Sequence, residues 1–227
     1  MSLQEISGRI GQRFEEMDRA RDQSLINARK VIKNCSLAIR AVHRGEAPEV
    51  EQFMAEARKL LDTACEQLRS YPDVYYSGFL QDAEKEYAEA QITYRIVSGK
   101  SLPTPEELGV DYAPFLNGMA EAVGELRRQV LDLLRRGDLE RAENLLSMMD
   151  DIYYVLISMD FPDAITRGLR RSTDIARGCL EKTRGDLTHH SAGQNLEREL
   201  SSIRNRLSVE ADQLLQAARF LDLDLAQ

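Results

Sequence analysis

The sequence lacks tryptophan, has few aromatic residues and holds little cysteine. Aromatic residues make up 6% of its 227 positions, and the three cysteines are Cys35, Cys65 and Cys179. Their number is odd and their spacings are wide, so no two of them form a CxxC pair. This excludes a zinc ribbon or a thioredoxin-like redox motif. We expect three reduced thiols on helix faces, as in a protein of a reducing compartment.

Long apolar runs are missing as well. The chain begins MSLQEISGRIGQRF, which has no apolar stretch of the kind that a secretory signal requires. No run of about 18 apolar residues occurs anywhere, so we expect no membrane span. Together with the reduced thiols, these absences predict a cytoplasmic protein without a membrane partner.

Several catalytic signatures are also absent. There is no glycine-rich dinucleotide fingerprint and no P-loop, so no phosphate-cradling loop is predicted. The histidines are His43, His189 and His190, and none stands in an ExxH or HxxxH pattern. A ferritin-like di-iron site and a zincin site are therefore not expected.

Charge is plentiful but unevenly distributed. Charged residues make up 30% of the chain, and the formal net charge is −8. An acidic balance by itself argues against nucleic acid, because attraction to phosphate is the main source of affinity there. The distribution of the basic residues along the chain matters more here than their sum.

Apolar residues recur at spacings of three and four through nearly the whole chain, which is the period of amphipathic helices. No stretch alternates with a period of two. The pattern predicts an all-α fold of about seven helices in a long antiparallel bundle, the first of them spanning 3–44. The other helices are expected over Val50–Leu68, 77–98, 113–136, 138–159, 165–187 and Leu196–Leu221. A first helix of this length is too long for a compact monomer to cover, so we expect an oligomer.

Two pairs of glutamates stand at helical spacing on neighbouring predicted helices. Glu86 and Glu89 are three residues apart, and Glu121 and Glu125 are four apart, so each pair shares a helix face. The second pair is surrounded by small residues: Gly118, Ala120, Ala122 and Gly124. If the two helices pack against each other in antiparallel fashion, the four carboxylates converge.

Converging carboxylates raise one another's pKa and oppose folding unless something positive lies between them. Mg²⁺ or Mn²⁺ is the natural partner, because these ions take oxygen ligands. Such a site can activate water for attack on a phosphodiester. From the spacing alone, exposed glutamates with no role beyond solvation remain an open interpretation, and the one that the spacing favours.

A basic strip lies on the first predicted helix. No acidic residue occurs from Gln23 to Gly45, and Arg29, Lys33, Arg40 and Arg44 fall on one face. At 1.5 Å per residue this strip is about 20 Å long. It suits a phosphate backbone. The alternative is a solvated face that pairs with acidic helices of a neighbouring subunit.

Three segments taken together resemble the translin family, in particular its prokaryotic-type members. They read EYAEA, FLNGMAEAVGELRR and GLRRSTDIARGCLEKTRGDL, in the order and at the spacing typical of that family. The resemblance covers about residues 5–188. It leaves 189–227 as a C-terminal helical extension of one translin-like domain that spans 1–227.

The resemblance implies assembly into a hollow octamer that encloses nucleic acid. The family includes translin, a nucleic-acid binder, and translin-associated factor X, which supplies an Mg²⁺-dependent endoribonuclease site with acidic residues on two helices. Carried over to this chain, that site falls on Glu86, Glu89, Glu121 and Glu125. Where animal nucleases carry Asp, this chain has Glu121.

These observations lead to one leading hypothesis. We expect a metal-dependent endoribonuclease that acts on short or structured RNA inside a homo-oligomeric shell, with Mg²⁺ or Mn²⁺ as cofactor. The predicted RNA-binding residues are Arg29, Lys33, Arg40 and Arg44. Two alternatives stay open: a non-catalytic binder of RNA or single-stranded DNA, and an all-α nucleotide pyrophosphohydrolase.

Overall fold

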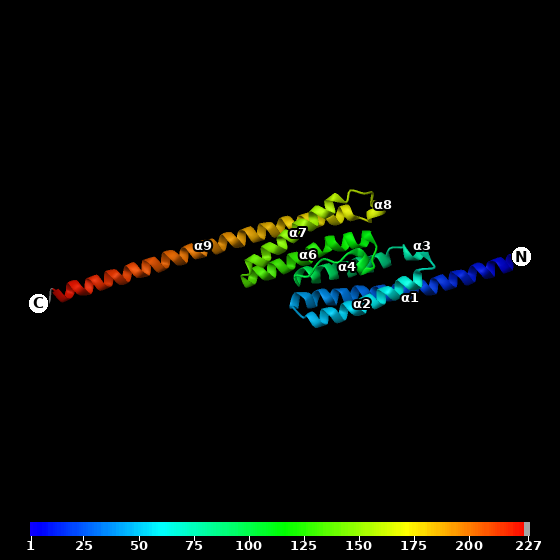
Figure 1. Ribbon diagram of the computed structural model, residues 1–227, viewed down its shortest axis with the longest axis horizontal. Helices are drawn as coiled ribbons and strands as arrows, with labels where there is room; N and C mark the ends of the chain where they lie inside the picture. Colours follow the sequence, from blue (N-terminus) through cyan, green and yellow to red (C-terminus); the bar gives the residue numbers. More distant parts are fainter. Residues whose placement is uncertain (225–227) are drawn as a thin grey trace. The chain divides into compact units, whose positions relative to one another are not determined.

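The computed structural model describes the backbone of residues 1–224 and the side chains of residues 1–216. All regular structure in this part of the chain is α-helical, which confirms the predicted fold class (Figure 1). The side chain of Leu221 and the last residues of the predicted extension, 225–227, lie outside the described part. None of the described helices combines the length and the apolar character needed to cross a membrane.

Six long helices and three short ones follow one another along the described residues. The long helices are α1 (Leu3–Arg44), α2 (Ala47–Leu68), α4 (Phe79–Val97), α6 (Tyr112–Arg136), α7 (Leu139–Ser158) and α9 (Leu169–Asp224). The short ones are α3 (Pro72–Tyr75), α5 (Pro105–Leu108) and α8 (Asp163–Thr166). The first five predicted helices are confirmed with small shifts at their ends. The last two predicted helices form the single helix α9, because no proline lies between residues 188 and 195 to stop it.

Both ends of α1 follow from local sequence. Ser2 and Glu5 form a capping box, in which the Ser2 hydroxyl accepts a hydrogen bond from the Glu5 N–H and the Glu5 carboxylate accepts one from the Ser2 N–H. At the other end Gly45 has φ 76°, in the left-handed region that favours glycine, and its N–H closes the last turn. The chain turns there at once into α2.

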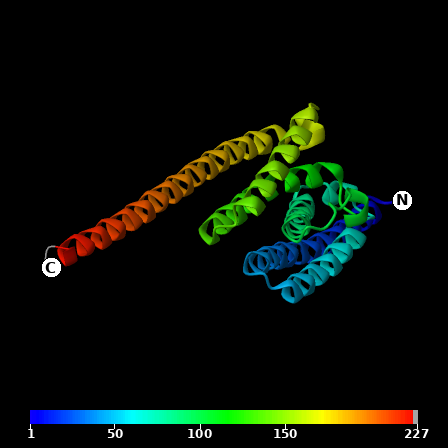
Figure 2. The ribbon, with the colours of Figure 1, turned by 60° about the vertical axis from the view of Figure 1, so that its left-hand side comes forward.

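Contacts divide the chain into two parts, Met1–Thr183 and Arg184–Gln227. In the first part, called the bundle below, α1 packs against α2 and α4, α4 packs against α6, and α6 packs against α7 (Figure 2). The first turns of α9 also contact α6. The buried core runs through all of these helices, with Leu61, Leu80, Ile92, Leu126 and Met149 among its largest members.

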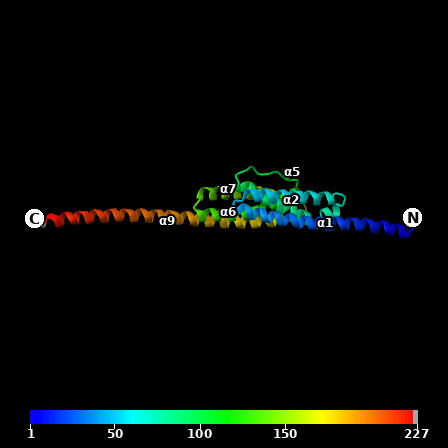
Figure 3. The same ribbon diagram turned by 90° about the horizontal axis from the view of Figure 1, so that it is seen from below.

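The central helices α4 and α6 run parallel, which differs from the antiparallel packing considered for them from the sequence. The starts of the two helices lie together, because Gly78 before α4 and Pro114 in the first turn of α6 line the same pocket. Further along both helices, Glu125 of α6 is close enough to Glu89 of α4 for its charge to raise the pKa of Glu89. The connection 98–111, which includes α5, returns the chain along the outside of the bundle (Figure 3). At up to about 3.3 Å per residue it is long enough to do so. The pairs α1–α2 and α6–α7, joined by tight turns, are antiparallel.

Candidate metal centre and nucleic-acid interface

Gly118 sets the distance between α4 and α6. A Cβ atom at this position would lie 2.5 Å from the carbonyl oxygen of Lys85 and 2.9 Å from the backbone nitrogen of Glu89. Only glycine therefore lets the two backbones touch here. One turn later along α6, Glu121 is brought against the face of α4 that carries Glu86 and Glu89.

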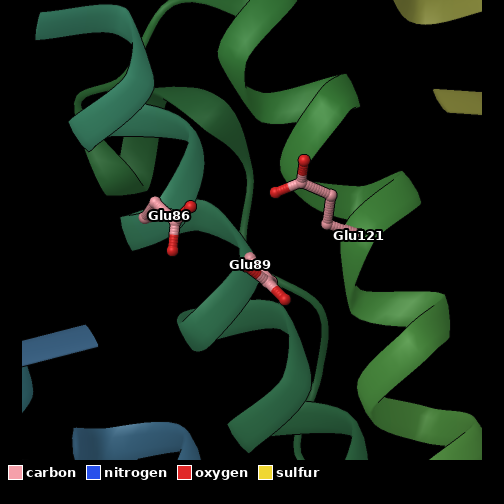
Figure 4. Close-up of side chains that lie close together, drawn as sticks. All are labelled: Glu86, Glu89 and Glu121. Carbon is pink, nitrogen blue, oxygen red and sulfur yellow. The ribbon is translucent and has the colours of Figure 1, made fainter. Parts of the chain in front are cut away.

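Three carboxylates meet at this crossing. Glu86 and Glu89 from α4 and Glu121 from α6 each offer a carboxylate oxygen, and these oxygens lie within 4.8 Å of one another. Figure 4 shows Glu121 reaching from α6 toward the two glutamates of α4. We call this group the carboxylate cluster. The structure thus brings together three of the four glutamates that the sequence singled out.

The cluster is partly removed from water, and this perturbs its ionisation. Glu89 is only 8% exposed, and burial, followed by the charges of Glu86, Glu121 and Glu125, raises its pKa to about 8. Burial also raises the pKa of Glu86, and Glu121 adds to the effect. At neutral pH the cluster therefore holds a proton or needs positive charge beside it.

Lys85 supplies part of that positive charge. Its Nζ donates a hydrogen bond of 2.8 Å to the Glu121 carboxylate and lies 4.0 Å from the Glu86 carboxylate. Burial alone lowers the pKa of Lys85, but the hydrogen bond to Glu121 and the charges of the nearby carboxylates together outweigh it, so the pKa is raised. One ammonium beside three carboxylates leaves the ionised cluster with net negative charge.

Glu125 lies one turn beyond Glu121 and outside the group of three. Its carboxylate pairs at 2.6 Å with His43 Nε2, and His43 Nδ1 lies 3.3 Å from the side-chain oxygen of Gln129. The hydrogen bond with His43 lowers the pKa of Glu125, so this carboxylate is ionised at neutral pH. Its charge is close enough to raise the pKa of Glu89.

The donor set fits a hard divalent cation. Every candidate ligand is a carboxylate oxygen, which Mg²⁺ and Mn²⁺ prefer over nitrogen or sulfur. The pKa of Glu89 is raised because negative charge is crowded and buried there, and a bound cation would relieve that crowding. The residues present therefore suit the metal that the sequence led us to expect.

The basic strip faces away from the carboxylate cluster. Arg29, Lys33, Arg40 and Arg44 are all exposed. Arg44 pairs with Glu46, and no ion pair is found for the other three within the described residues. Burial and then the charges of Glu86 and Glu89 raise the pKa of the Cys35 thiol. Cys35 therefore lies on the side of α1 that faces the carboxylate cluster. At 100° per residue the strip and Cys35 are separated by about 150° around the helix.

A pocket beside the cluster carries other cations. It has a volume of about 560 Å³, and its lining includes Lys85, Glu121, Arg167 and Arg171. Arg171 has no ion-pair partner among the described residues, whereas its neighbour Arg170 pairs with Asp160 at 3.5 Å. In the sequence these arginines stand among acidic residues such as Asp163 and Asp174, and they form no uninterrupted basic strip. Their place beside Glu121 depends on how α9 packs on α6.

Comparisons with known proteins find relatives of this chain in sequence and in fold. No protein-family model matches the chain. An uncharacterized protein of Methanocaldococcus jannaschii is 28% identical over 196 residues, which are 85% of this chain and 86% of that protein.

Among solved structures, a complex of AfC3PO with duplex RNA is similar with a TM-score of 0.77 at 35% identity, over 82% of this chain and 96% of that one. A crystal structure of AfC3PO is similar with a TM-score of 0.76 at 35% identity, over 82% of this chain and 97% of that one. The apo-NeC3PO structure gives 0.74 at 21% identity, over 81% and 96%, and shows likeness of fold alone.

Proposed function

This chain belongs to the translin family, as a prokaryotic-type member, and we propose on that basis that it is a metal-dependent endoribonuclease. Its substrate is short or structured RNA, held inside a homo-oligomeric shell of the octameric kind that the family resemblance implies. The observation that carries the proposal is the carboxylate cluster of Glu86, Glu89 and Glu121. A chain that only bound RNA would gain nothing from three crowded acidic groups, which repel phosphate.

The cluster would hold Mg²⁺ or Mn²⁺ through Glu86, Glu89 and Glu121. A divalent ion bound there activates water and offsets negative charge on the phosphodiester. Lys85 holds the Glu121 carboxylate by its hydrogen bond and so fixes one ligand in place. Glu125, the fourth predicted ligand, is ionised and oriented by His43, which suits it to orient the attacking water at the edge of the cluster.

RNA as the ligand is supported by the complex of AfC3PO with duplex RNA, a relative 35% identical to this chain. In the present chain Arg167 and Arg171 lie beside Glu121, where they can hold a phosphate next to the bond that is cleaved. The basic strip lies on the side of α1 that faces away from the carboxylate cluster. It would therefore contact RNA that extends past the subunit's own cluster, or RNA bound at the cluster of a neighbouring subunit.

Assembly is supported by the exposed end of α1. Leu3, Ile10 and Phe14 are 84%, 49% and 60% exposed, although they continue the apolar stripe of the helix. An exposed apolar stripe of this kind marks a protein contact. We propose that neighbouring subunits cover it.

One experiment separates the proposal from its alternatives. A labelled RNA and a nucleoside triphosphate are each incubated with the protein and Mg²⁺, Mn²⁺ or EDTA, and the products are resolved. The proposal predicts internal cleavage of RNA with either metal and none with EDTA. Binding of RNA without cleavage would favour a non-catalytic RNA binder, and hydrolysis of the triphosphate alone would favour a nucleotide pyrophosphohydrolase.

A further inference from the structure

The C-terminal part of α9 carries an uncovered apolar stripe. In the second part of the chain, drawn orange to red in Figure 1, five large apolar residues recur along one face. They are Leu196 (57% exposed), Leu200 (56%), Ile203 (43%), Leu207 (60%) and Leu214 (71%). The steps between them are four, three, four and seven residues. This is the seven-residue repeat of a coiled coil, in which the stripe is covered by a second helix.

The repeat assigns a heptad position to each residue. Leu200, Leu207 and Leu214 take position a, and Leu196 and Ile203 take position d. The next d position is Glu210. In a parallel pair of identical helices in register, residues at d face their own copies, so Glu210 would meet the partner's Glu210 across the apolar seam. Like charges at that place disfavour the parallel arrangement.

The charged residues beside the stripe favour the antiparallel arrangement. Glu197 and Arg204 take position e, and Glu199 and Arg206 take position g. Neither glutamate has a basic residue three or four positions away, so neither can form an ion pair along its own helix. Their charges are left available for a second chain.

We propose that residues 193–210 pair with the same segment of a second copy of this chain in an antiparallel coiled coil. Leu200 then packs against the partner's Ile203, and Leu196 packs against the partner's Leu207. Position e meets position e, and g meets g, across the two-fold axis. Glu197 therefore faces the partner's Arg204, and Glu199 faces the partner's Arg206. Each of these opposite-charge contacts occurs twice by symmetry.

The same register also accommodates Glu210. In the antiparallel pair it lies opposite the partner's Gly193, at the end of the overlap, where its carboxylate reaches water. A parallel pair would satisfy only the contact between Glu199 and the partner's Arg204. The sequence of the segment is thus self-complementary in one direction and not in the other. This inference does not depend on the proposed function, because no residue of the carboxylate cluster lies in the segment.

Disulfide trapping in the full chain tests both the contact and its direction. The double variant Leu196→Cys/Leu207→Cys should form a disulfide-linked dimer under mild oxidation, because the two positions face each other across the pair. Each single variant should form no more disulfide-linked dimer than the parent chain does. The parent chain shows how much cross-linking Cys35, Cys65 and Cys179 cause by themselves. The matched control is Arg198→Cys/Asn205→Cys, since both of these positions point outward.

The outcomes decide the proposal. Cross-linking of the double variant alone supports the antiparallel pair. Cross-linking of both single variants as strongly as the double variant would show a parallel pair, and no cross-linking above the outward control would show that the segment does not pair. Either of these last results overturns the proposal.

Charge exchange gives a second test in the same Leu196→Cys/Leu207→Cys background. Glu199→Arg should lower the cross-linked fraction, and adding Arg206→Glu should restore it. Adding Arg204→Glu instead should lower it further, because like charges then face each other at both e and g. Restoration by Arg204→Glu rather than by Arg206→Glu would contradict the antiparallel register. Circular dichroism of each variant checks that the helices are retained.

Discussion

Replacing Glu89 by Gln should stabilise the protein in the absence of divalent metal, and increasingly so as the pH rises. The pKa of Glu89 in the folded chain is raised from its ordinary value of 4.5 to about 8, first by burial and then by Glu86. The folded chain therefore binds this proton more tightly than the unfolded chain does. Stability is lost as the pH rises from 4.5 to 8, and Glu89→Gln removes that loss because glutamine does not ionise.

The size of the effect follows from the same values. A pKa raised from 4.5 to about 8 corresponds to a ceiling of about 5 kcal/mol in the free energy of unfolding above pH 8. The expected gain from Glu89→Gln is thus close to zero at pH 4 and largest at pH 9. Added Mg²⁺ should narrow this difference, since an ion at 100 times its dissociation constant stabilises the parent by about 2.7 kcal/mol and the variant by less.

The assay is denaturant unfolding of parent and variant at pH 4, 7 and 9, with EDTA and with Mg²⁺. Glu56 is an exposed glutamate on α2, and Glu56→Gln is the matched control. It should leave the free energy of unfolding unchanged at every pH. If Glu89→Gln destabilises the chain at pH 9 in EDTA, or if its effect does not depend on pH, the crowding of charge at the cluster has been misjudged.

Three further predictions concern the packing of the site and its contacts with RNA. Gly118→Ala should destabilise the fold by about 1–3 kcal/mol in thermal or denaturant unfolding, because its Cβ would press on the Lys85 carbonyl; Gly124→Ala, where nothing lies within 4 Å, is the control, and equal effects of the two would contradict the account. Arg171→Gln should weaken RNA binding and lower the slope of log affinity against log salt by about 0.7 on a single strand, as for the loss of one phosphate contact. An unchanged slope would remove Arg171 from the interface. Reversing the charge of three strip residues should lower that slope by about 0.9 per phosphate contact on a duplex. The variant carries Arg29→Glu, Lys33→Glu and Arg40→Glu. An unchanged slope would mean that the strip faces protein.

Local pattern was enough to predict the first five long helices, although it divided α9 into two. The apolar spacing and Gly45 determine the bounds of α1, because each of these signals depends only on residues close together in the sequence. The paired spacing of Glu86 and Glu89 likewise predicted their shared face. The sequence placed Gly118 among the small residues beside Glu121, and the structure shows that it is the one of the two glycines there at which α4 comes close.

Features that depend on how distant segments pack could not be predicted in this way. The parallel course of α4 and α6 depends on the path of the connection 98–111, which carries no periodic signal. The pairing of Glu125 with His43 joins residues 82 positions apart. Lys85 stands in the same EKEYAEA segment as the glutamates, and its spacing of four from Glu89 is the one signal that could have drawn attention to it.

The most direct test of the central claim is RNA cleavage by the parent and by Glu86→Gln, Glu89→Gln and Glu121→Gln, measured together with RNA binding. Each change removes one ligand charge and keeps the side-chain size, so we expect cleavage in Mg²⁺ to fall by at least ~100-fold. Binding of the same RNA, measured in EDTA, should stay at the level of the parent, because the arginines that contact phosphate are unchanged. Variants that cleave RNA like the parent would show that the carboxylate cluster is not the site of catalysis.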